Sequence, residues 1–465
     1  MQQTVANESE NLAVRAEDGQ ISRAFLDRVA TASESGDRKS LTELVVPLHE
    51  ADLADVLEAL KPEQRRRLVQ LLGADFDFLA LTEVDDAIRD EILEMLPNEA
   101  VAEAVRDLHT DDAIHILEDL DEGAQREILA QIPHPERATL RRSLEFPDET
   151  AGRRMQSEFI AVPPFWAVGQ TIDHMRESDD LPEDFYEIFI VDPAFRPIGT
   201  VSLNRLLRSK RPVPMQEIME PEIYTVSATE DQEEVARTFE RYDLVSAAVV
   251  DESGRLVGVI TVDDIIDVIE EEASEDIRLL GGVGDEEISD SVLTTTRNRF
   301  GWLLVNLGTA ILASWVISLF DATISQMVAL AVLMPIVASM GGNAGTQTMT
   351  VAVRAIATGD LARFNVRRVI SRETTVGLLN GCLFAVIIGV VAGVWFANAE
   401  LGGVIGLAMV VNMVAAGLFG ILVPISLHRL KLDPALASGT FVTTVTDVVG
   451  FFAFLGLAAW WFGLA

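Results

Sequence analysis

The feature that most constrains this chain is its last third, which is apolar and almost free of charge. Residues 299–465 contain only 8 Lys or Arg and 6 Asp or Glu, whereas residues 1–298 contain 28 and 67. A membrane-spanning helix needs roughly 20 mostly apolar residues, and five stretches are long enough: Phe300–Phe320, Met327–Ala357, Val376–Ala397, Val404–Leu427 and Ala435–Ala465. The sequence therefore predicts an acidic soluble part followed by a membrane domain with five spans.

The loops between these spans predict how the chain lies in the membrane. Residues 319–326, residues 397–402 and the C-terminal end contain no Lys or Arg, whereas the alternate loops contain Arg363, Arg367, Arg368, Arg372, Arg429 and Lys431. Because basic residues are enriched in cytoplasmic loops, we expect the N-terminus in the cytoplasm and the C-terminus outside. The polar, acidic first twenty residues predict no cleavable secretion signal. We therefore expect a multi-pass protein of the cell (inner) membrane, surrounded by membrane lipid.

The net charge of −37 excludes a nucleic-acid binder as the leading hypothesis, because phosphate backbones require clustered Lys and Arg. Divalent cations are the expected partners instead. Only 4 of the 36 basic residues are Lys, so adaptation of the surface to high salt is a second explanation of the acidity. Cys382 is the only cysteine, which excludes a disulfide framework and a cysteine-based zinc site.

One acidic residue, Asp447, lies well inside a predicted span, after Thr443 and Thr444 and before Gly450. A charge in hydrocarbon is costly and usually faces a protein interior or a water-filled path. We predict a cation site in a pore; the alternative is a protonated Asp447 that holds helices together. The absence of Arg or Lys from the middle of any span disfavours an anion pathway.

The second predicted span contains a glycine-rich segment, Met340-Gly341-Gly342-Asn343-Ala344-Gly345-Thr346-Gln347. The glycines predict a break in the helix, and irregular backbone at membrane depth is tolerated only where protein or water lines it. We expect Asn343 to line the pore, with a simple packing kink as the alternative. The available ligands are all oxygen atoms, which suits a hard cation such as Mg²⁺ held through its water molecules, without excluding Ca²⁺, Mn²⁺ or Na⁺.

The soluble part begins with a weak internal repeat. The segment from Leu48-His49-Glu50 to Leu60 resembles the segment from Leu108-His109-Thr110 to Leu120, sixty residues later. Short amphipathic helices with this repeat predict a stacked helical solenoid over residues 21–145. We expect His49 and His109 to begin helices rather than to bind metal.

A second repeat follows from residue 146. Strand-like segments at Phe159–Val162, Phe189–Asp192 and Ile198–Leu203 recur at Ile223–Val226, Ala248–Asp251 and Val257–Val262, and a helix follows each copy. This tandem pattern resembles a pair of CBS domains. The resemblance implies a site for ATP or another adenosine nucleotide at Thr261 and Asp264, whereas the first copy has Ser202 and Arg205 there. A purely structural pair is the alternative.

An acidic segment, Glu270–Asp276, connects this module to the first span. A charge run is usually a solvated helix face. Placed above a pore mouth, however, an acidic helix repels itself until cations neutralise it, so ion binding could set its position.

The whole order of domains resembles the MgtE family of magnesium channels. The matching motifs are Gly341–Gln347, Asp433-Pro434-Ala435-Leu436, Thr444–Gly450 and Val262–Ile277. The resemblance implies a multidomain α + α/β membrane protein: a disordered tail (1–20), a helical superhelix (21–145), CBS domain 1 (146–213), CBS domain 2 (214–268), an acidic plug helix (269–298) and a five-span pore domain (299–465). It also implies a homodimer with its pore on the two-fold axis, and no enzymatic activity.

The same resemblance implies that the pore holds hydrated Mg²⁺ at Asp447, with Asn343, Thr443, Thr444 and Gly450 around it. It further implies that cytosolic Mg²⁺ closes the pore by bridging acidic residues of the soluble domains. By motif position these regulatory ligands are Asp111, Glu233, Asp243, Asp264, Asp267, Glu272, Glu275, Asp276 and Asp433. His115 departs from the pattern, since an acid is expected there. An ion-coupled Na⁺/Mg²⁺ exchanger and a membrane-tethered nucleotide sensor are the alternative functions.

Overall fold

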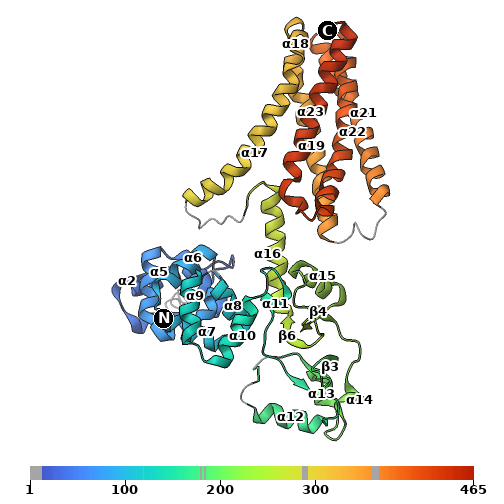
Figure 1. The fold of residues 1–465 in the computed structure, drawn as a ribbon. Helices are drawn as coiled ribbons and strands as arrows, with labels where there is room; N and C mark the ends of the chain where they lie inside the picture. The colour runs from blue at the N-terminus through green and yellow to red at the C-terminus, as the bar shows by residue number, and fades with distance from the viewer. Residues whose placement is uncertain are drawn as a thin grey trace, which may run out of the picture. The chain divides into compact units, whose positions relative to one another are not determined.

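The computed structural model describes residues 13–118, 120–178, 181–182, 185–284, 292–358 and 366–464, without the side chains of residues 436–438. It divides into two compact units, Met1–Glu270 and Glu271–Ala465 (Figure 1). The first unit contains the helical domain and the two sheets. The second contains the helices of the apolar third.

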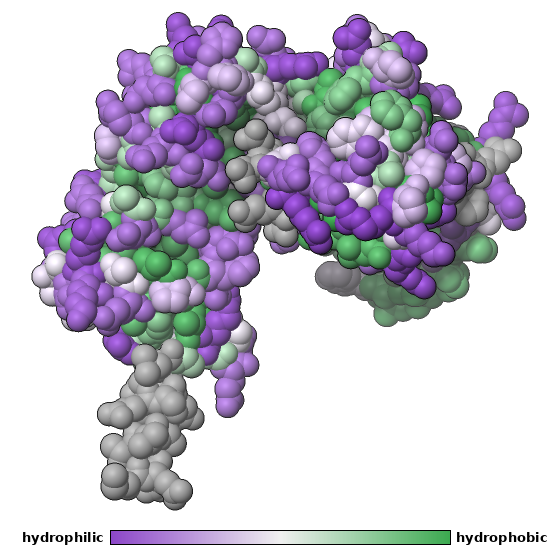
Figure 2. Space-filling view, turned by 90° about the horizontal axis from the view of Figure 1, so that it is seen from below, coloured by the Kyte–Doolittle hydropathy of each residue, from purple (hydrophilic) through white to green (hydrophobic). Residues whose placement is uncertain are grey.

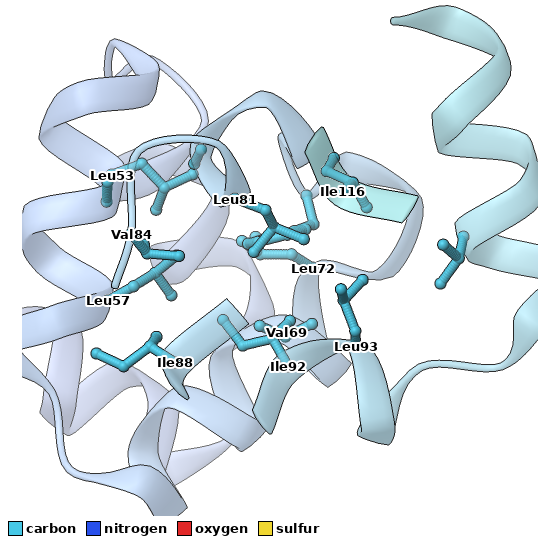
Figure 3. Packing of buried hydrophobic residues seen from close by; sticks show 14 of the residues in the cluster. Leu53, Leu57, Val69, Leu72, Leu81, Val84, Ile88, Ile92, Leu93 and Ile116 are labelled. Carbon is cyan, nitrogen blue, oxygen red and sulfur yellow. The ribbon is translucent and has the colours of Figure 1, made fainter. Parts of the chain in front are cut away.

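Short helices form the helical domain, as predicted. They are α2 (Arg23–Ser35), α3 (Arg38–Val45), α4 (Glu50–Ala59), α5 (Pro62–Leu72), the 3₁₀ turns η1 (Gly73–Asp75) and η2 (Phe78–Leu81), α6 (Asp86–Met95), α7 (Asn98–Asp107), α8 (Thr110–Glu118), α9 (Glu122–Gln131) and α10 (His134–Leu144). Each helix buries a stripe of branched apolar side chains in one continuous core, to which Leu57, Leu72 and Ile92 contribute (Figure 3). His49 caps α4, since its Nδ1 accepts a hydrogen bond from the Ala51 N–H, which confirms its role at a helix start.

The predicted disordered tail is too long by several residues. Residues 1–12 lie outside the described residues, but Arg15 forms an isolated bridge with Ile21 and ion pairs with Asp52 and Asp55 on α4. The prediction was wrong for residues 13–20 because polar composition alone does not reveal that one arginine meets two carboxylates of the neighbouring helix.

Two three-stranded sheets confirm the tandem repeat. The first copy contains α11 (Ala151–Arg154), β1 (Ala161–Val162), α12 (Val168–Glu177), β2 (Glu187–Val191), β3 (Pro197–Ser202), α13 (Leu203–Arg208) and α14 (Met215–Ile218); the second contains β4 (Thr225–Ser227), α15 (Gln232–Tyr242), β5 (Ser246–Val250) and β6 (Leu256–Thr261). In both sheets the first two strands are parallel and the last two antiparallel. Gly199 and Gly258 occupy equivalent positions, where a Cβ would lie within 2.7 Å of a backbone carbonyl oxygen.

The helix that leaves the second sheet is longer than predicted. α16 runs without interruption from Val262 to Leu280, so the expected boundary between CBS domain 2 and the plug helix, at residues 268 and 269, falls inside one helix. The boundary between the two compact units, after Glu270, falls inside it as well.

The second unit contains five helices that are long and apolar enough to cross a membrane, among the described residues. They are α17 (Val292–Ser318), α19 (Ala329–Ala357), α21 (Val366–Trp395), α22 (Ala399–Arg429) and α23 (Pro434–Phe462), with the short α18 (Asp321–Gln326) between the first two. Glycines let α21 and α22 approach backbone to backbone, since a Cβ on Gly377 would lie 2.5 Å from the Met413 carbonyl oxygen and one on Gly402 would lie 2.3 Å from the Gly389 carbonyl oxygen. α17 diverges from the other helices towards its N-terminus (Figure 1).

The predicted break in the second span is absent, because α19 passes through Gly341, Gly342 and Asn343 as a regular helix. Glycine costs a helix about 1 kcal/mol relative to alanine, and here tight packing offsets that cost. A Cβ on Gly341 would lie 2.1 Å from Nδ2 of Asn412, and one on Gly345 would lie 2.6 Å from the Val442 side chain. The glycines therefore admit neighbouring helices rather than interrupt their own.

Outside the membrane helices the surface is largely hydrophilic. Figure 2, which views the molecule from below, shows hydrophilic residues over most of the visible face, with hydrophobic residues between them. This distribution agrees with the excess of acidic residues in the first 298 positions.

Candidate functional site: carboxylates in the membrane helices and in the acidic domains

Asp447 and the threonines before it lie on α23. The hydroxyls of Thr443, Thr444 and Thr446 donate hydrogen bonds to backbone carbonyls one turn earlier, so their polar atoms are satisfied within the helix. Asp447 is half-buried, and among the described residues no group donates a hydrogen bond to its carboxylate. The threonine oxygens keep free lone pairs, but this carboxylate is the one group of the segment that would carry a negative charge to a ligand.

The structure brings the two predicted pore segments together. A Cβ on Gly342 would lie 3.9 Å from the Thr443 side chain, so the glycine-rich part of α19 faces the threonines of α23. Gly450, predicted at the pore, packs against Asn412, since a Cβ there would lie 2.7 Å from Nδ2. Asn412 is fully buried and donates to the Val337 carbonyl oxygen at 2.8 Å.

A polar stripe runs along α19. It consists of Asn343, Thr346, Gln347 and Thr350, all exposed in the single chain and spaced so that they share one helix face. Such a stripe is unfavourable against lipid, because membrane proteins bury polar side chains against protein or water. It marks a surface that a second protein surface or a water-filled path covers.

Sequence analysis missed a second carboxylate in the membrane helices. Glu373 lies on α21, one turn after Val369 and Ile370, and is only 9% exposed. It lies 3.8 Å from the guanidinium group of the exposed Arg372. The predicted span began at Val376 because Arg372 and Glu373 lowered the local hydropathy. Helix-spaced apolar residues from Val366 onwards were the signal that could have found the earlier start.

In the acidic domains, the structure brings together Asp111 of α8 and Asp264 of α16. Their carboxyl groups share a hydrogen bond, and the other Asp111 oxygen is buried without a partner. Burial, with Asp112 as the next cause, raises the pKa of Asp111 to about 7, and burial followed by the charge of Asp111 raises the pKa of Asp264 to about 8. This pair requires either a shared proton or a cation.

Further acids surround this pair. Burial, and then the charge of Asp264, raises the pKa of Asp112 to about 6, and burial also raises the pKa values of Asp267 and Glu83. Sequence analysis had not singled out Asp112 or Glu83. Within the described residues no group of three or more His, Cys, Asp or Glu is arranged to hold a metal ion. The donor set of carboxylates with one unpartnered buried oxygen nevertheless fits a hard cation that keeps part of its water shell.

The other predicted regulatory residues of the first unit do not join this cluster. Glu233 pairs with Arg237 at 2.6 Å on α15, and Asp243 adopts the left-handed conformation that ends this helix. The position expected to be acidic, His115, contacts Arg89 at 2.8 Å and Glu118 at 3.3 Å, and Glu118 in turn lies 3.5 Å from Arg153. Paired charges thus join α8 to α11 where the family resemblance implied a cation.

The remaining predicted ligands lie in the second unit. Glu272, Glu275 and Asp276 are half-buried and share one face of α16 with Leu279, because they precede it by seven, four and three residues. Leu279 packs in a cluster with Met349, Val353, Ala435 and Val442. Asp433 caps α23 by accepting a hydrogen bond from the Ala435 N–H. The acidic face of α16 therefore leads to the beginning of α23.

Thr261 and Asp264, the nucleotide residues predicted in the second copy, bond to each other. The backbone N–H of Thr261 (3.3 Å) and its hydroxyl (2.7 Å) donate to the Asp264 carboxylate. This contact lies in the first turn of α16. In the first copy, Arg205 at the corresponding position pairs with Glu220 at 2.9 Å.

Together, five apolar helices with a carboxylate inside them and an acidic module of helices and paired sheets define a membrane protein of the ion-transporting class. A family model described as a divalent cation transporter matches residues 334–457, one described as the MgtE intracellular N domain matches residues 48–149, and one for the CBS domain matches residues 215–271. The chain belongs to the MgtE family.

Curated relatives cover most of the chain. It is 35% identical to a magnesium transporter MgtE of Enterococcus faecalis over 70% of this chain and 72% of the relative, and 36% identical to one of Thermus thermophilus over 69% and 72%. Among solved structures, the cytosolic domain of the Mg²⁺ channel MgtE in complex with ATP is similar with 30% identity, a TM-score of 0.49, and coverage of 52% of this chain and 99% of that one.

Proposed function

We propose that this chain is a Mg²⁺-selective channel that imports Mg²⁺ down its electrochemical gradient and that cytosolic Mg²⁺ closes. The observation that carries the proposal is Asp447, a carboxylate inside a membrane helix with no protein donor among the described residues. Membership of a family of divalent cation transporters, and relatives named as magnesium transporters, support Mg²⁺ as the cargo. A transporter has no catalytic residues, and none is proposed.

The pore is formed by two copies of the chain. The polar stripe on α19 and the half-buried Asp447 on α23 both lack a complete protein environment in one chain, and a two-fold axis beside them would enclose these groups in a shared water-filled path. Asp447 of each subunit then binds the hydrated ion, because Mg²⁺ releases its water reluctantly and is commonly held by one or two carboxylates. Asn343, Thr443, Thr444 and Gly450 lie along the same path.

Closure depends on acidic residues outside the pore. Mg²⁺ replaces the proton shared by Asp111 and Asp264, whose burial disfavours two bare charges. Asp267 contributes to the same site. Glu272, Glu275, Asp276 and Asp433 bind Mg²⁺ between α16 and the start of α23, and Glu233 and Asp243 are peripheral ligands. The N-terminus is cytoplasmic and the C-terminus outside.

An adenosine nucleotide, such as ATP, binds the CBS pair near Thr261 and Asp264 in this proposal. Because the Thr261 hydroxyl and the Asp264 carboxylate already bond to each other, nucleotide binding must compete with that contact. A Na⁺/Mg²⁺ exchanger is the second candidate function, and Glu373 is the observation that favours it, since coupling requires a second ion site in the membrane helices.

Mg²⁺ flux into liposomes that contain the purified protein tests the proposal. Asp447→Ala should abolish flux, and Asp321→Ala is the matched control because Asp321 carries the same charge at the start of α18, outside the five spans. Flux through the unmodified protein should fall as Mg²⁺ on the cytosolic side rises. Flux that persists in Asp447→Ala would refute the pore assignment, and flux that requires an opposing Na⁺ gradient would establish the exchanger instead.

A further inference from the structure

A cavity of about 590 Å³ lies between α9 and α10, near the end of the helical domain and apart from every carboxylate discussed above. Arg126 and Leu129 of α9 line one side. Arg137, Arg141 and Arg142 of α10 line the other. In a chain with a net charge of −37, four arginines around one cavity form an isolated positive site.

Helical spacing explains why these side chains converge. On α10, His134, Arg137 and Arg141 are separated by three and four residues, so they project from one face. On α9, Arg126 and Leu129 are separated by three residues and face them. The cavity therefore combines a largely basic rim with an apolar wall.

Ion pairs leave most of this positive charge uncompensated. Arg126 pairs with Glu122 of its own helix at 3.3 Å, and Glu136 of α10 pairs away from the cavity with Arg106. Glu145 is the one acid among the residues that line the cavity. In the described part of the chain, no carboxylate forms an ion pair with Arg137, Arg141 or Arg142. Arg137 donates to the Ala130 carbonyl oxygen at 3.4 Å, and Arg142 acts on Asp251 only through its charge.

The N-terminus of α10 adds to the positive potential. Its first residue, His134, lines the cavity, and the capping residue, Pro133, supplies no side-chain acceptor to the first turn. The free N–H groups and the helix dipole at such an end favour an anion.

We propose that this cavity binds a small organic anion with at least two phosphate groups. Guanidinium groups bind phosphate in a bidentate manner, and three arginines without an ion-pair partner exceed what one phosphate group needs. The volume lies within the range of small-molecule sites, and Leu129 provides an apolar wall for the organic part. This site is separate from the nucleotide site proposed at Thr261, and it does not depend on the transport function.

Binding of pyrophosphate to the full-length protein in detergent, without Mg²⁺, tests the charge recognition. The double variant Arg137→Gln/Arg141→Gln should weaken binding at least tenfold. The matched control is Arg66→Gln/Arg67→Gln, which removes two exposed arginines of α5 in the same domain and should change the affinity less than twofold. No saturable binding to the unmodified protein, or equal losses in both double variants, would overturn the proposal.

A variant at the exposed Ala138 keeps the test decisive if the double variant folds poorly. Ala138→Glu places a carboxylate in the cavity and should weaken pyrophosphate binding as strongly while the circular dichroism spectrum stays unchanged; unchanged binding would overturn the proposal.

ADP tests the organic part of the ligand. It should bind more tightly than pyrophosphate, and Arg137→Gln/Arg141→Gln should weaken that binding even when Thr261→Ala is present. If Thr261→Ala alone eliminates ADP binding and the arginine variant has no effect on it, the cavity does not bind an organic phosphate.

Discussion

Asp264→Asn isolates the chemistry of the buried carboxyl pair. The amide keeps the shape of the side chain and can still donate to Asp111, but it carries no charge to compete for a proton or attract a cation. In the unmodified protein the raised pKa values mean that Mg²⁺ must displace protons to bind. In Asp264→Asn, Mg²⁺ should therefore release fewer protons when it binds, and its affinity at neutral pH should be lower.

The size of the effect follows from the two pKa values. With a pKa of about 8 for Asp264, about half of the carboxyl group is ionised at pH 8 and about one hundredth at pH 6, so Mg²⁺ affinity should fall about 50-fold. If Asp111, with a pKa of about 7, must also ionise, the fall approaches about 500-fold. In Asp264→Asn only Asp111 still releases a proton. Mg²⁺ affinity should therefore fall by about tenfold or less between pH 8 and pH 6.

The same pKa values set the sign of the stability change. Both are raised above the ordinary value of 3.8, so without a cation the pair contributes most to stability at low pH. That contribution falls as the pH rises above about 4 and is lost once the pH has passed about 7 to 8. Mg²⁺ should therefore raise the unfolding temperature more at pH 8 than at pH 6.

Titration calorimetry of the full-length protein measures proton release directly, when Mg²⁺ binding is compared in two buffers of different ionisation enthalpy. We expect between one and two protons released per Mg²⁺ at this site near pH 7 and fewer near pH 9. Carboxylates with ordinary pKa values release none at these pH values. Asp112, with a pKa of about 6, is already mostly ionised at pH 7, so most of the signal comes from the pair.

Asp263→Asn is the matched control, because Asp263 is the exposed neighbour on the same turn of α16. It makes the same chemical change outside the pair. Because the charge of Asp263 is only the last of the causes that raise the pKa of Asp264, proton release should fall far less than in Asp264→Asn. Proton release near zero in the unmodified protein, or the same release in Asp264→Asn, would refute the assignment of Mg²⁺ to the carboxyl pair.

Two further predictions concern the membrane helices. Gly341→Ala should destabilise the protein by about 1–3 kcal/mol, because the new methyl group would overlap the buried Asn412, whereas Gly342→Ala meets its nearest atom at 3.9 Å and should be tolerated; the temperature of irreversible inactivation in detergent measures both. Glu373→Gln should leave that temperature unchanged or raise it, since it removes a poorly paired buried charge, and should preserve Mg²⁺ flux; loss of flux would place Glu373 on the ion path.

The sequence predicted the elements well where one periodicity dominates. The repeated strands and the five apolar helices were found because alternation and long apolar runs depend only on local residue type. The helix break predicted at Gly341 was wrong, because the role of a glycine in a helix does not depend on local residue type alone. Whether glycine interrupts a helix or admits a neighbour depends on what packs against it, and Asn412 lies about seventy residues away in the chain.

Parts of the candidate sites could not be predicted from the sequence, because they depend on packing between helices that are distant in the chain. Asp111 and Asp264 could be suspected separately, but their shared hydrogen bond, and the participation of Asp112, depend on how α8 packs against the start of α16. The arginine-lined cavity was missed because its residues are split between two helices, and their acidic neighbours in sequence conceal the local excess of positive charge.

In the proposed function, α16 is the helix that connects the acidic residues to the helices of the membrane domain. Among the described helices, α16 alone begins in the first unit, at the carboxyl pair, and ends in the second, where Leu279 packs with residues of α19 and α23. Those two helices carry the polar stripe and Asp447. A ligand shifts a gate only if it binds one state more tightly, and Mg²⁺ meets this condition wherever closure brings like charges together. If the proposed gating is correct, neutralisation of the acidic face that leads to Leu279 and Asp433 should favour one position of α16, and with it one state of the pore.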